Sequence, residues 1–151
     1  MRFALEPSDS LSATALYSAF VTDIAKRYPG WSPADSGSAQ PAVFTPPSGA
    51  WLVGYIGSEP VACGGLQQIA SDIAEVRRVF VHSDHRGEGL GRALLGALTE
   101  QARLLGYGRV CLDTGDHQPE ALGLFRSVGF REVAPFNANP FAAHWLELDL
   151  A

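Results

Sequence analysis

The sequence predicts a single α+β domain in which most elements are β-strands, and three observations support this. The chain has 151 residues, enough for one domain with its own core. Hydrophobic residues make up 46% and charged residues 18%, the balance of a soluble globular protein. Short β-rich runs alternate along the chain with segments of helical period, and no repeat or composition change marks a domain boundary. We therefore expect residues 1–151 to form one domain.

The N-terminal third predicts a strand, a helix and a long loop. Phe3–Glu6 is a short apolar segment, and Pro7–Ser10 supplies turn and cap residues before a helix. In that helix, apolar residues recur at spacings of three to four, at Leu11, Ala15, Tyr17, Val21 and Ile24. The segment Pro29–Gly49 holds five of the ten prolines and predicts a loop with one short helical turn. Long loops in compact domains are often functional, so this one is a candidate for shaping a binding site.

The remainder predicts three strands in an antiparallel meander and then alternating helices and strands. The three β-rich runs are separated by turn residues, and the long segment after them changes to helical period. The expected elements are strands Trp51–Ile56, Val61–Ile69 and Ile73–His82, helix Leu90–Leu105, strand Arg109–Asp113, helix Pro119–Val128, and strands Phe130–Ala134 and Ala142–Leu150.

Charge and cysteine content narrow the function classes. The net charge is -5, whereas proteins that bind nucleic acid usually carry a basic face, so we expect no nucleic-acid partner. Met1–Glu6 contains no apolar stretch long enough for a signal peptide, and no run of about 18 apolar residues occurs, so we expect a cytoplasmic protein without a membrane span. Cys63 and Cys111 lie in apolar stretches, which favours two buried thiols over a disulfide.

The most informative segment joins the third meander strand to the long helix. It reads Val79-Phe80-Val81-His82-Ser83-Asp84-His85-Arg86-Gly87-Glu88-Gly89-Leu90-Gly91-Arg92, a strand followed by a glycine-rich turn that opens a helix. Glycine lets backbone N–H groups point inward with no Cβ in the way. At a helix N-terminus these N–H groups lack partners and lie at the positive end of the helix dipole. The segment therefore predicts a phosphate-binding site.

Two common phosphate-binding motifs do not fit this segment. The dinucleotide fingerprint G-x-G-x-x-G fails, because the sixth residue is Arg92 when counted from Gly87 and Leu94 when counted from Gly89. The Walker loop requires a lysine directly after its last glycine, and Lys26 is the only lysine in the chain.

The pattern that fits is R-x-x-G-x-G, at Arg86, Gly89 and Gly91, directly after the strand. It resembles the acetyl-CoA pyrophosphate loop of the GNAT acyltransferase superfamily. A second segment, Ala121–Phe130, resembles the next helix of that superfamily, which ends in an aromatic residue, three residues and Gly-Phe. The two motifs stand in the expected order with one strand between them, and the resemblance extends from about Trp51 to the C-terminus.

The resemblance implies a mixed, mostly antiparallel central sheet of about six to seven strands flanked by helices. It also implies acetyl-CoA as the acyl-donor substrate and transfer of the acetyl group to a primary amine of a small molecule or peptide by direct attack. Arg92 could equally be a solvated helix residue. The implied contacts are backbone groups of Val79, Phe80 and Val81 at the pantetheine, residues Arg86, Gly87, Glu88, Gly89, Leu90, Gly91 and Arg92 at the pyrophosphate, and Phe125 beside the thioester.

Glu75 is the candidate general base. An attacking amine must be neutral, whereas an alkyl ammonium has a pKa of about 10.4 in water, so some group must take its proton. Histone-acetylating members of the superfamily carry their base at the offset of Glu75, six residues before Val81. Period-two geometry predicts that Glu75, Arg77, Val79 and Val81 share one face of the strand. The alternative is a glutamate that only pairs with Arg77.

Asp116 and His117, just after the next strand, are weaker candidates for the base. The resemblance implies that a backbone N–H of Phe80 or Val81 holds the oxyanion.

The general acid departs from the superfamily pattern. Many relatives have a tyrosine where Phe125 stands, and a phenyl ring donates no proton. A thiolate with a pKa of about 8.5 is a tolerable leaving group without a strong acid. Tyr55 and Tyr107 cannot be located from sequence.

Other functions stay open at this point. A non-catalytic acyl-CoA-binding or regulatory module is an alternative because of Phe125, and a protein N-acetyltransferase is another. His82 and His85 lie in a connecting loop without a further ligand cluster, so we expect no metal. We expect the loop 29–49, the first helix and segment 135–140 to set acceptor specificity, with aromatic residues Trp31, Phe44, Phe136 and Phe141 as candidate walls. A homodimer is compatible with the resemblance, since many relatives are dimers.

Overall fold

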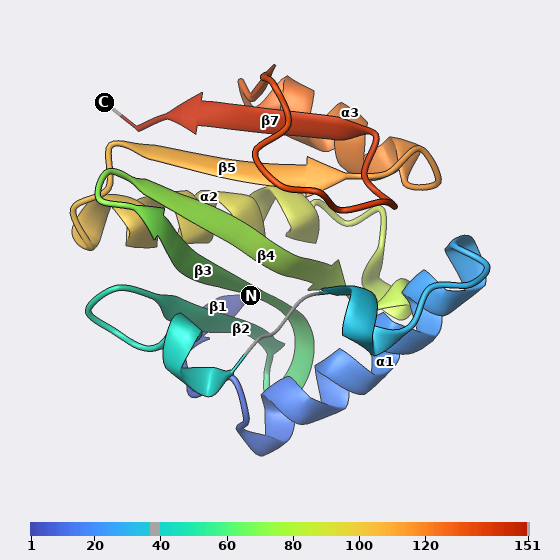
Figure 1. Cartoon of the computed structure of the whole chain (residues 1–151). Helices are drawn as coiled ribbons and strands as arrows, with labels where there is room; N and C mark the ends of the chain where they lie inside the picture. The colour runs from blue at the N-terminus through green and yellow to red at the C-terminus, as the bar shows by residue number, and fades with distance from the viewer. Residues whose placement is uncertain (37–39, 151) are drawn as a thin grey trace.

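The computed structural model describes residues 1–36 and 40–150, in which helices pack on a β-sheet (Figure 1). Its strands form a seven-stranded sheet in the order β1-β2-β3-β4-β5-β7-β6. The described elements are β1 (Arg2–Leu5), α1 (Leu11–Arg27), the 3₁₀ turns η1 (Pro33–Ser36) and η2 (Pro41–Phe44), β2 (Ala50–Ile56), β3 (Glu59–Ala70), β4 (Ile73–Val81), the turn η3 (Ser83–His85), α2 (Leu90–Leu104), β5 (Arg109–Thr114), α3 (Pro119–Ser127), β6 (Arg131–Glu132) and β7 (His144–Asp149). The predicted fold class is therefore confirmed.

The sheet is antiparallel except where β4 pairs with β5. The predicted meander of β2, β3 and β4 is present, and every predicted helix and strand occurs within two residues of its expected ends or as a shorter element. The segment expected to be a loop with one short helical turn contains two turns, η1 and η2. Residues 37–39 of that loop lie outside the described part of the chain.

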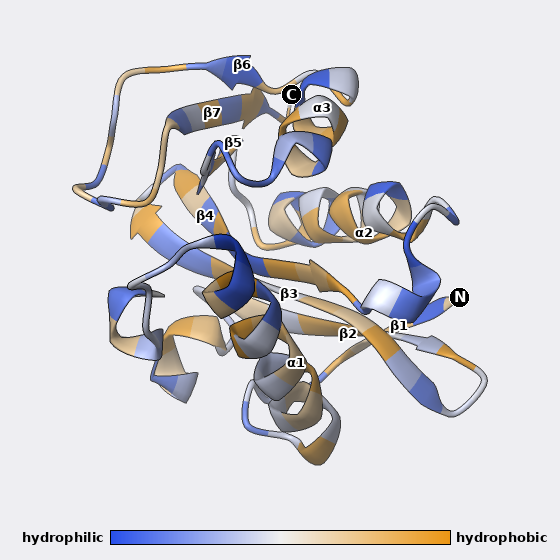
Figure 2. Ribbon diagram, turned by 90° about the vertical axis from the view of Figure 1, so that its right-hand side faces the viewer, coloured by the Kyte–Doolittle hydropathy of each residue, from blue (hydrophilic) through white to orange (hydrophobic). Residues whose placement is uncertain are grey.

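Two apolar cores lie on opposite faces of the sheet. On one face, α2 contributes the fully buried residues Leu94, Leu95 and Leu98, and α3 contributes Phe125. On the other face, α1 packs through Ala13 and Leu16. Figure 2 shows the same arrangement, with α1 on one side of the sheet and α2 and α3 on the other. Each buried leucine contributes about 1.5–3 kcal/mol. The helical period predicted the buried face of α2 correctly, but the face predicted for α1 is wrong in part. The helix α1 buries Ala13, Leu16 and Ile24, whereas Leu11 and Ala15 are exposed.

β4 contains a bulge that changes which side chains share a face. Gly65 pairs with Arg77 and Cys63 pairs with Phe80, so the single residue between them on β3 opposes two residues on β4. Arg78 has a φ of 56, the only non-glycine residue with positive φ among those described. Such an inserted residue offsets the alternation of side chains.

The prediction that Glu75, Arg77, Val79 and Val81 share one face is therefore wrong. Val79 and Val81 pack with Val76 in the core that contains α2. Glu75 and Arg77 alternate with the residues of that core and point to the α1 face.

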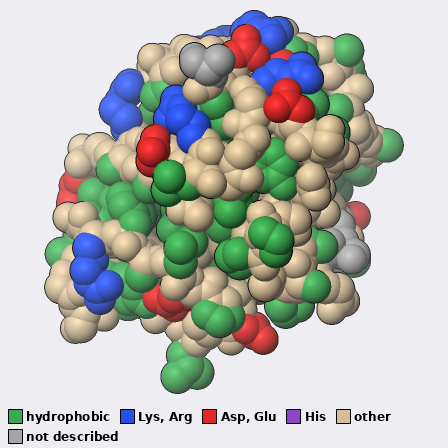
Figure 3. Space-filling model, turned by 90° about the vertical axis from the view of Figure 1, so that its left-hand side faces the viewer, with side chains coloured by type: hydrophobic (Ala, Val, Ile, Leu, Met, Phe, Trp, Pro, Cys, Tyr) green, Lys and Arg blue, Asp and Glu red, His purple; other side chains and the backbone are tan. Residues whose placement is uncertain are grey.

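The surface carries mixed charge, and the two thiols are buried. Near the upper edge of the face in Figure 3, acidic and basic side chains lie next to one another. The end of the sheet carries ion pairs of Arg131 with Glu147 and Asp149. Cys63 and Cys111 are buried free thiols, as predicted. In the described parts of the chain, no helix combines the length and the apolar character needed to span a bilayer.

Candidate functional site

The candidate site lies where the parallel strands β4 and β5 separate. Their pairing joins Ile73 to Arg109, Ala74 to Val110 and Glu75 to Cys111, and it continues no further among the described residues. Beyond this point the strands diverge toward their carboxyl ends (Figure 1). A cavity of about 930 Å³ occupies the divergence, a size typical of small-molecule sites. Its walls come from α1, β4, the glycine-rich turn, β5, α3 and residues 137–141.

The glycine-rich turn forms one end of the cavity. Gly87 and Gly89 have φ values of 81 and 80, and a Cβ at either position would meet no atom within 4 Å. The space beside the backbone is therefore open. Gly89 is the N-cap of α2 and provides no side-chain cap, so the first N–H groups of this helix remain available to an anion. A Cβ at Gly91 would lie 3.1 Å from Leu124, which indicates that α2 and α3 approach closely here.

Arg86 and Arg92 flank this turn at the cavity wall, where both are exposed. Arg86 donates from Nε to the Val81 carbonyl at 3.1 Å and pairs with Asp23 of α1 at 3.4 Å. Arg92 donates to the Ser127 hydroxyl at 2.6 Å. Both guanidinium groups therefore have protein partners at the end of the cavity where an anion would bind.

Eleven of the twelve residues predicted for the cofactor and catalytic site line the cavity. The predicted residues that line the cavity are Glu75, Val79, Phe80, Val81, Arg86, Gly87, Gly89, Leu90, Gly91, Arg92 and Phe125. Glu88 does not line it, and its carboxylate lies 3.5 Å from His85. Phe125 is 5% exposed and packs against Phe130, so it belongs to both the cavity wall and the core.

Glu75 lines the cavity near the start of β4, whereas the glycine-rich turn follows the end of that strand. The side chain of Glu75 is 16% exposed. Burial raises the pKa of the Glu75 carboxyl; Arg77 opposes this increase and Asp113 adds to it. The carboxyl thus has an environment that favours uptake of a proton, which is the requirement for a general base near neutral pH.

Asp113 holds a loop over this part of the cavity, which sequence reasoning missed. Its carboxylate accepts bonds from the side-chain amides of Asn137 at 2.6 Å and Asn139 at 3.4 Å. Asn137 also accepts a bond from the Trp145 indole at 2.9 Å. The segment 137–141 lines the cavity, so Asp113 fixes one of its walls. No local motif marks this contact, because the partners are 24 and 26 residues apart.

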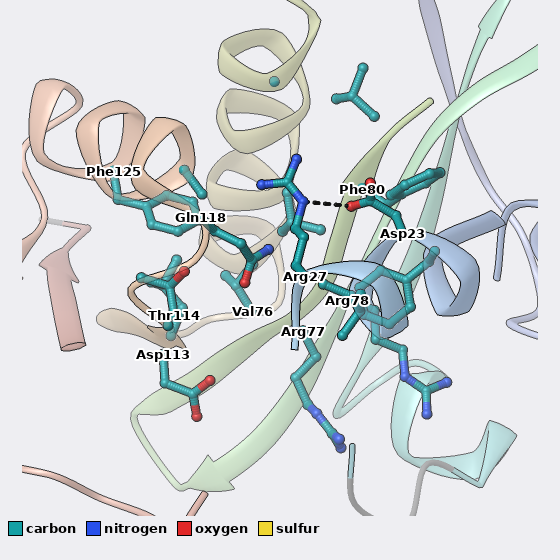
Figure 4. Close-up of a pocket in the computed structure, with 18 of the residues that line it drawn as sticks. Asp23, Arg27, Val76, Arg77, Arg78, Phe80, Asp113, Thr114, Gln118 and Phe125 are labelled. Atoms are coloured by element: carbon teal, nitrogen blue, oxygen red, sulfur yellow. Dashed lines mark ion pairs between the residues drawn. The ribbon is translucent and has the colours of Figure 1, made fainter. Parts of the chain in front are cut away.

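The end of α1 is joined to the start of α3 across the cavity wall. Arg27 forms ion pairs with Glu120 and with Asp23, the latter at 3.2 Å and visible in Figure 4. The Tyr28 hydroxyl donates to Gln118 at 3.1 Å, and its ring stacks on His117 at 4.8 Å. Tyr28 is the one tyrosine among the described residues that line the cavity.

Other residues considered from the sequence are not among those that line the cavity. His117 and Asp116 do not line it, and Asp116 pairs with His144 at 3.0 Å. Tyr55 bonds to Glu6 and Tyr107 donates to the Ser48 carbonyl.

Of the four aromatic wall candidates, Trp31 and Phe141 line the cavity, whereas Phe44 packs against Trp51 in the core. Phe136 is not among the lining residues.

Neither thiol is suited to nucleophilic catalysis. Burial raises the pKa of both Cys63 and Cys111 to about 12, and neither lines the cavity. The thiolate is the reactive form of cysteine, so these groups are unreactive near neutral pH. Among the described residues, no group of three or more His, Cys, Asp or Glu is arranged to hold a metal ion.

Comparisons with known proteins agree with this geometry. Residues 15–130 match the model of the Acetyltransferase (GNAT) family. The chain is 36% identical to human N-acetyltransferase 8 over 82 residues, which are 54% of this chain and 35% of that protein. The chain thus spans about a third of the length of this relative.

Solved structures share the fold over nearly the whole chain. An acetyltransferase of the GNAT family from Staphylococcus aureus Mu50 superposes with a TM-score of 0.81 at 17% identity, covering 99% of this chain and 100% of that one. A Salmonella typhimurium protein solved with its cofactor acetyl-CoA gives a TM-score of 0.70 at 18% identity, covering 100% of this chain and 95% of that one. Because the family model matches most of the sequence, the chain belongs to the GNAT family of acetyltransferases.

Proposed function

We propose that this protein is an acetyl-CoA-dependent N-acetyltransferase that acetylates a primary amine of a small molecule or peptide. The observation that carries the proposal is the cavity between the separating strands β4 and β5, with the uncapped, glycine-rich N-terminus of α2 in one part and the half-buried Glu75 in another. The reaction requires a site that binds the pyrophosphate of the donor and a group that removes a proton from the ammonium of the acceptor.

The donor fits the glycine-rich end. The open backbone at Gly87 and Gly89 and the uncapped N–H groups of α2 match the pyrophosphate of coenzyme A. Arg86 and Arg92 would add charge-assisted bonds after exchange of their present partners. Among the described residues, no strand pairs with β4 on its β5 side at Val79–Val81, so this edge suits the amide groups of the pantetheine arm, which could bond to it as an added strand does.

Glu75 would prepare the acceptor. The carboxylate takes a proton from the ammonium, directly or through water, and the neutral amine nitrogen attacks the thioester carbonyl carbon. A backbone N–H of Phe80 or Val81 stabilises the oxyanion. A C–N bond forms and the C–S bond breaks, and the departing thiolate takes up the proton that the attacking nitrogen loses as the amide forms. This direct attack agrees with the absence of a reactive thiol among the described cavity-lining residues.

The proposal is tested with the purified protein in two assays. Calorimetry with acetyl-CoA reports donor binding, and release of free thiol with a panel of amines, polyamines and lysine peptides reports transfer. We expect both signals. Loss of acetyl-CoA binding would refute the proposal, whereas binding without thiol release would favour a non-catalytic acyl-CoA-binding module. A homodimer stays a prediction, to be checked by light scattering.

A further inference from the structure

Arg77 places a positive charge beside the candidate base. Both side chains precede the β4 bulge and point to the same face, and they are 15% and 16% exposed. Arg77 Nε lies 4.0 Å from Glu75 Oε1, and Arg77 Nη1 donates to Gln67 Oε1 at 2.7 Å. Gln67 is itself the cross-strand partner of Glu75. In this part of the cavity, β4 thus presents an acidic and a basic side chain two residues apart, and Asp113 of β5 is a second acidic group nearby.

This basic group is separate from the cations of the glycine-rich end. Arg86 and Arg92 bond to groups near that end, at Val81 and Ser127. In Figure 4, Arg77 and Asp113 extend toward the same side of the cavity, away from Phe125 and Gln118. The acceptor end therefore has a guanidinium of its own.

A simple amine gains nothing from Arg77. Its ammonium would be repelled by the guanidinium, and the guanidinium also lowers the pKa of Glu75, which weakens the base. Both disadvantages are removed by an acceptor that brings its own anionic group to Arg77. A carboxylate is well suited, since the guanidinium fork matches its two oxygens.

We propose that the acceptor is a free α-amino acid, whose carboxylate binds to Arg77 while its amine faces Glu75. One carbon carries both groups of such a substrate, so a single molecule can contact two side chains whose charged atoms lie 4.0 Å apart. Peptide N-termini and simple alkylamines lack the adjacent carboxylate and lose the contact to Arg77. This inference rests on the proposed function, because it concerns the acceptor of that reaction.

The experiment compares matched ligands by calorimetry, with the protein free and saturated with coenzyme A. The ligands are phenylalanine, leucine and methionine, each beside its amide and its decarboxylated amine. Charged hydrogen bonds of this kind are worth at least about tenfold in affinity, so at least one amino acid should bind that much more tightly than its two analogues. Equal binding within all three sets, or no binding by any amino acid, would overturn the inference.

Variants assign the preference to Arg77. Arg77→Gln should abolish the difference between an amino acid and its amide, and Arg77→Lys should keep part of it. Arg126→Gln, which removes an exposed guanidinium of α3 outside the cavity, should leave it unchanged. Thermal unfolding of each variant verifies the fold. A preference that survives in Arg77→Gln would exclude Arg77 as the carboxylate site.

The outcomes separate this inference from the proposed function. If acetyl-CoA binds and simple amines are acetylated as fast as amino acids, the function stands and the amino-acid inference fails. If acetyl-CoA does not bind, the function fails, while binding of amino acids to the free protein still reports on Arg77.

Discussion

Glu75 of β4 and Cys111 of β5 form the last pair between these two parallel strands among the described residues. The carboxyl of Glu75 thus lies where the sheet begins to open, beside the cavity but still fixed by backbone pairing on both edges of its strand. A group held in this way loses little entropy when a substrate binds next to it.

Replacement of Glu75 should therefore affect transfer and leave donor binding intact. We expect Glu75→Gln to lower kcat by about 10²–10⁴-fold, the usual contribution of a general base. Acetyl-CoA affinity, measured by calorimetry, should stay within about twofold because the proposed donor site lies at the glycine-rich turn, away from Glu75. Glu100→Gln, at an exposed position of α2, is the matched control. A fully active Glu75→Gln enzyme would remove Glu75 from the mechanism.

The same substitution should change how stability depends on pH. Burial raises the pKa of Glu75 in the folded state, so its contribution to stability is complete below the unfolded pKa of about 4.3 and is lost as pH rises through the folded value. Glutamine carries no charge and avoids this loss. We expect the Tm difference between Glu75→Gln and the native protein to grow in favour of the variant from pH 4 to pH 8. A difference that shrinks over this range would contradict the shift.

Gly89 and Gly96, both at α2, should respond in opposite directions to alanine. Gly89→Ala forces a left-handed backbone on an alanine, which costs about 1–2 kcal/mol, and it disturbs the N–H groups at the helix start. We expect weaker acetyl-CoA binding and lower stability. At Gly96, in the helix interior, a new Cβ meets no atom within 4 Å. Gly96→Ala should therefore raise the free energy of unfolding by about 0.5–1 kcal/mol without changing the affinity for acetyl-CoA. Calorimetry and urea unfolding measure both quantities, and equal losses of affinity in the two variants would count against the anion site.

Asp113→Ala should loosen the acceptor side of the cavity. The substitution removes the acceptor of two side-chain amide bonds and frees the segment that carries Asn137 and Asn139. We expect the acceptor KM to rise by about tenfold or more, since each bond to a charged group is worth about 1.5–3 kcal/mol. Acetyl-CoA affinity should not change. A fall in acetyl-CoA affinity with an unaltered acceptor KM would show that this loop serves the donor.

Phe125→Tyr tests whether a general acid limits the reaction. A thiol has a pKa of about 8.5, so its thiolate leaves without much help, and we expect kcat to change by less than about tenfold. Tyr28→Phe removes the hydroxyl of the one tyrosine among the described lining residues and serves as the comparison. Steady-state thiol release between pH 6 and pH 9 measures both. A large gain in Phe125→Tyr would indicate that protonation of the thiolate is slow in the native enzyme.

The sequence predicted those parts of the site that depend on local patterns. Gly87 and Gly89 mark a turn by their conformational freedom, and Leu94 and Leu98 mark the helix that follows. No local pattern predicts the bulge at Arg78. The residues on either side have the composition of one continuous strand, and arginine has no preference for a left-handed backbone.

Contacts between segments that are distant in the sequence could not be predicted either. Arg27 meets Glu120 across 93 residues, and Asp113 meets Asn137 across 24. These pairs form only when the sheet brings the segments together. In the sequence, their polar residues cannot be distinguished from residues that are simply exposed to solvent. Period-two reasoning failed at Val79 and Val81 for a related reason, since a single inserted residue reverses every side chain after it.

The inserted residue at Arg78 divides β4 into two stretches that can change independently. The side chains of residues 75 and 77 lie on the α1 face of the sheet, and those of residues 79 and 81 pack against the core that contains α2. Mutations that change the proposed acceptor contacts before the bulge can therefore accumulate without altering the proposed donor contacts after it. Such a division would let one ancestral scaffold diversify its acceptors by a few substitutions, and it identifies residues 75 and 77 as the positions to randomise when a new acceptor specificity is sought.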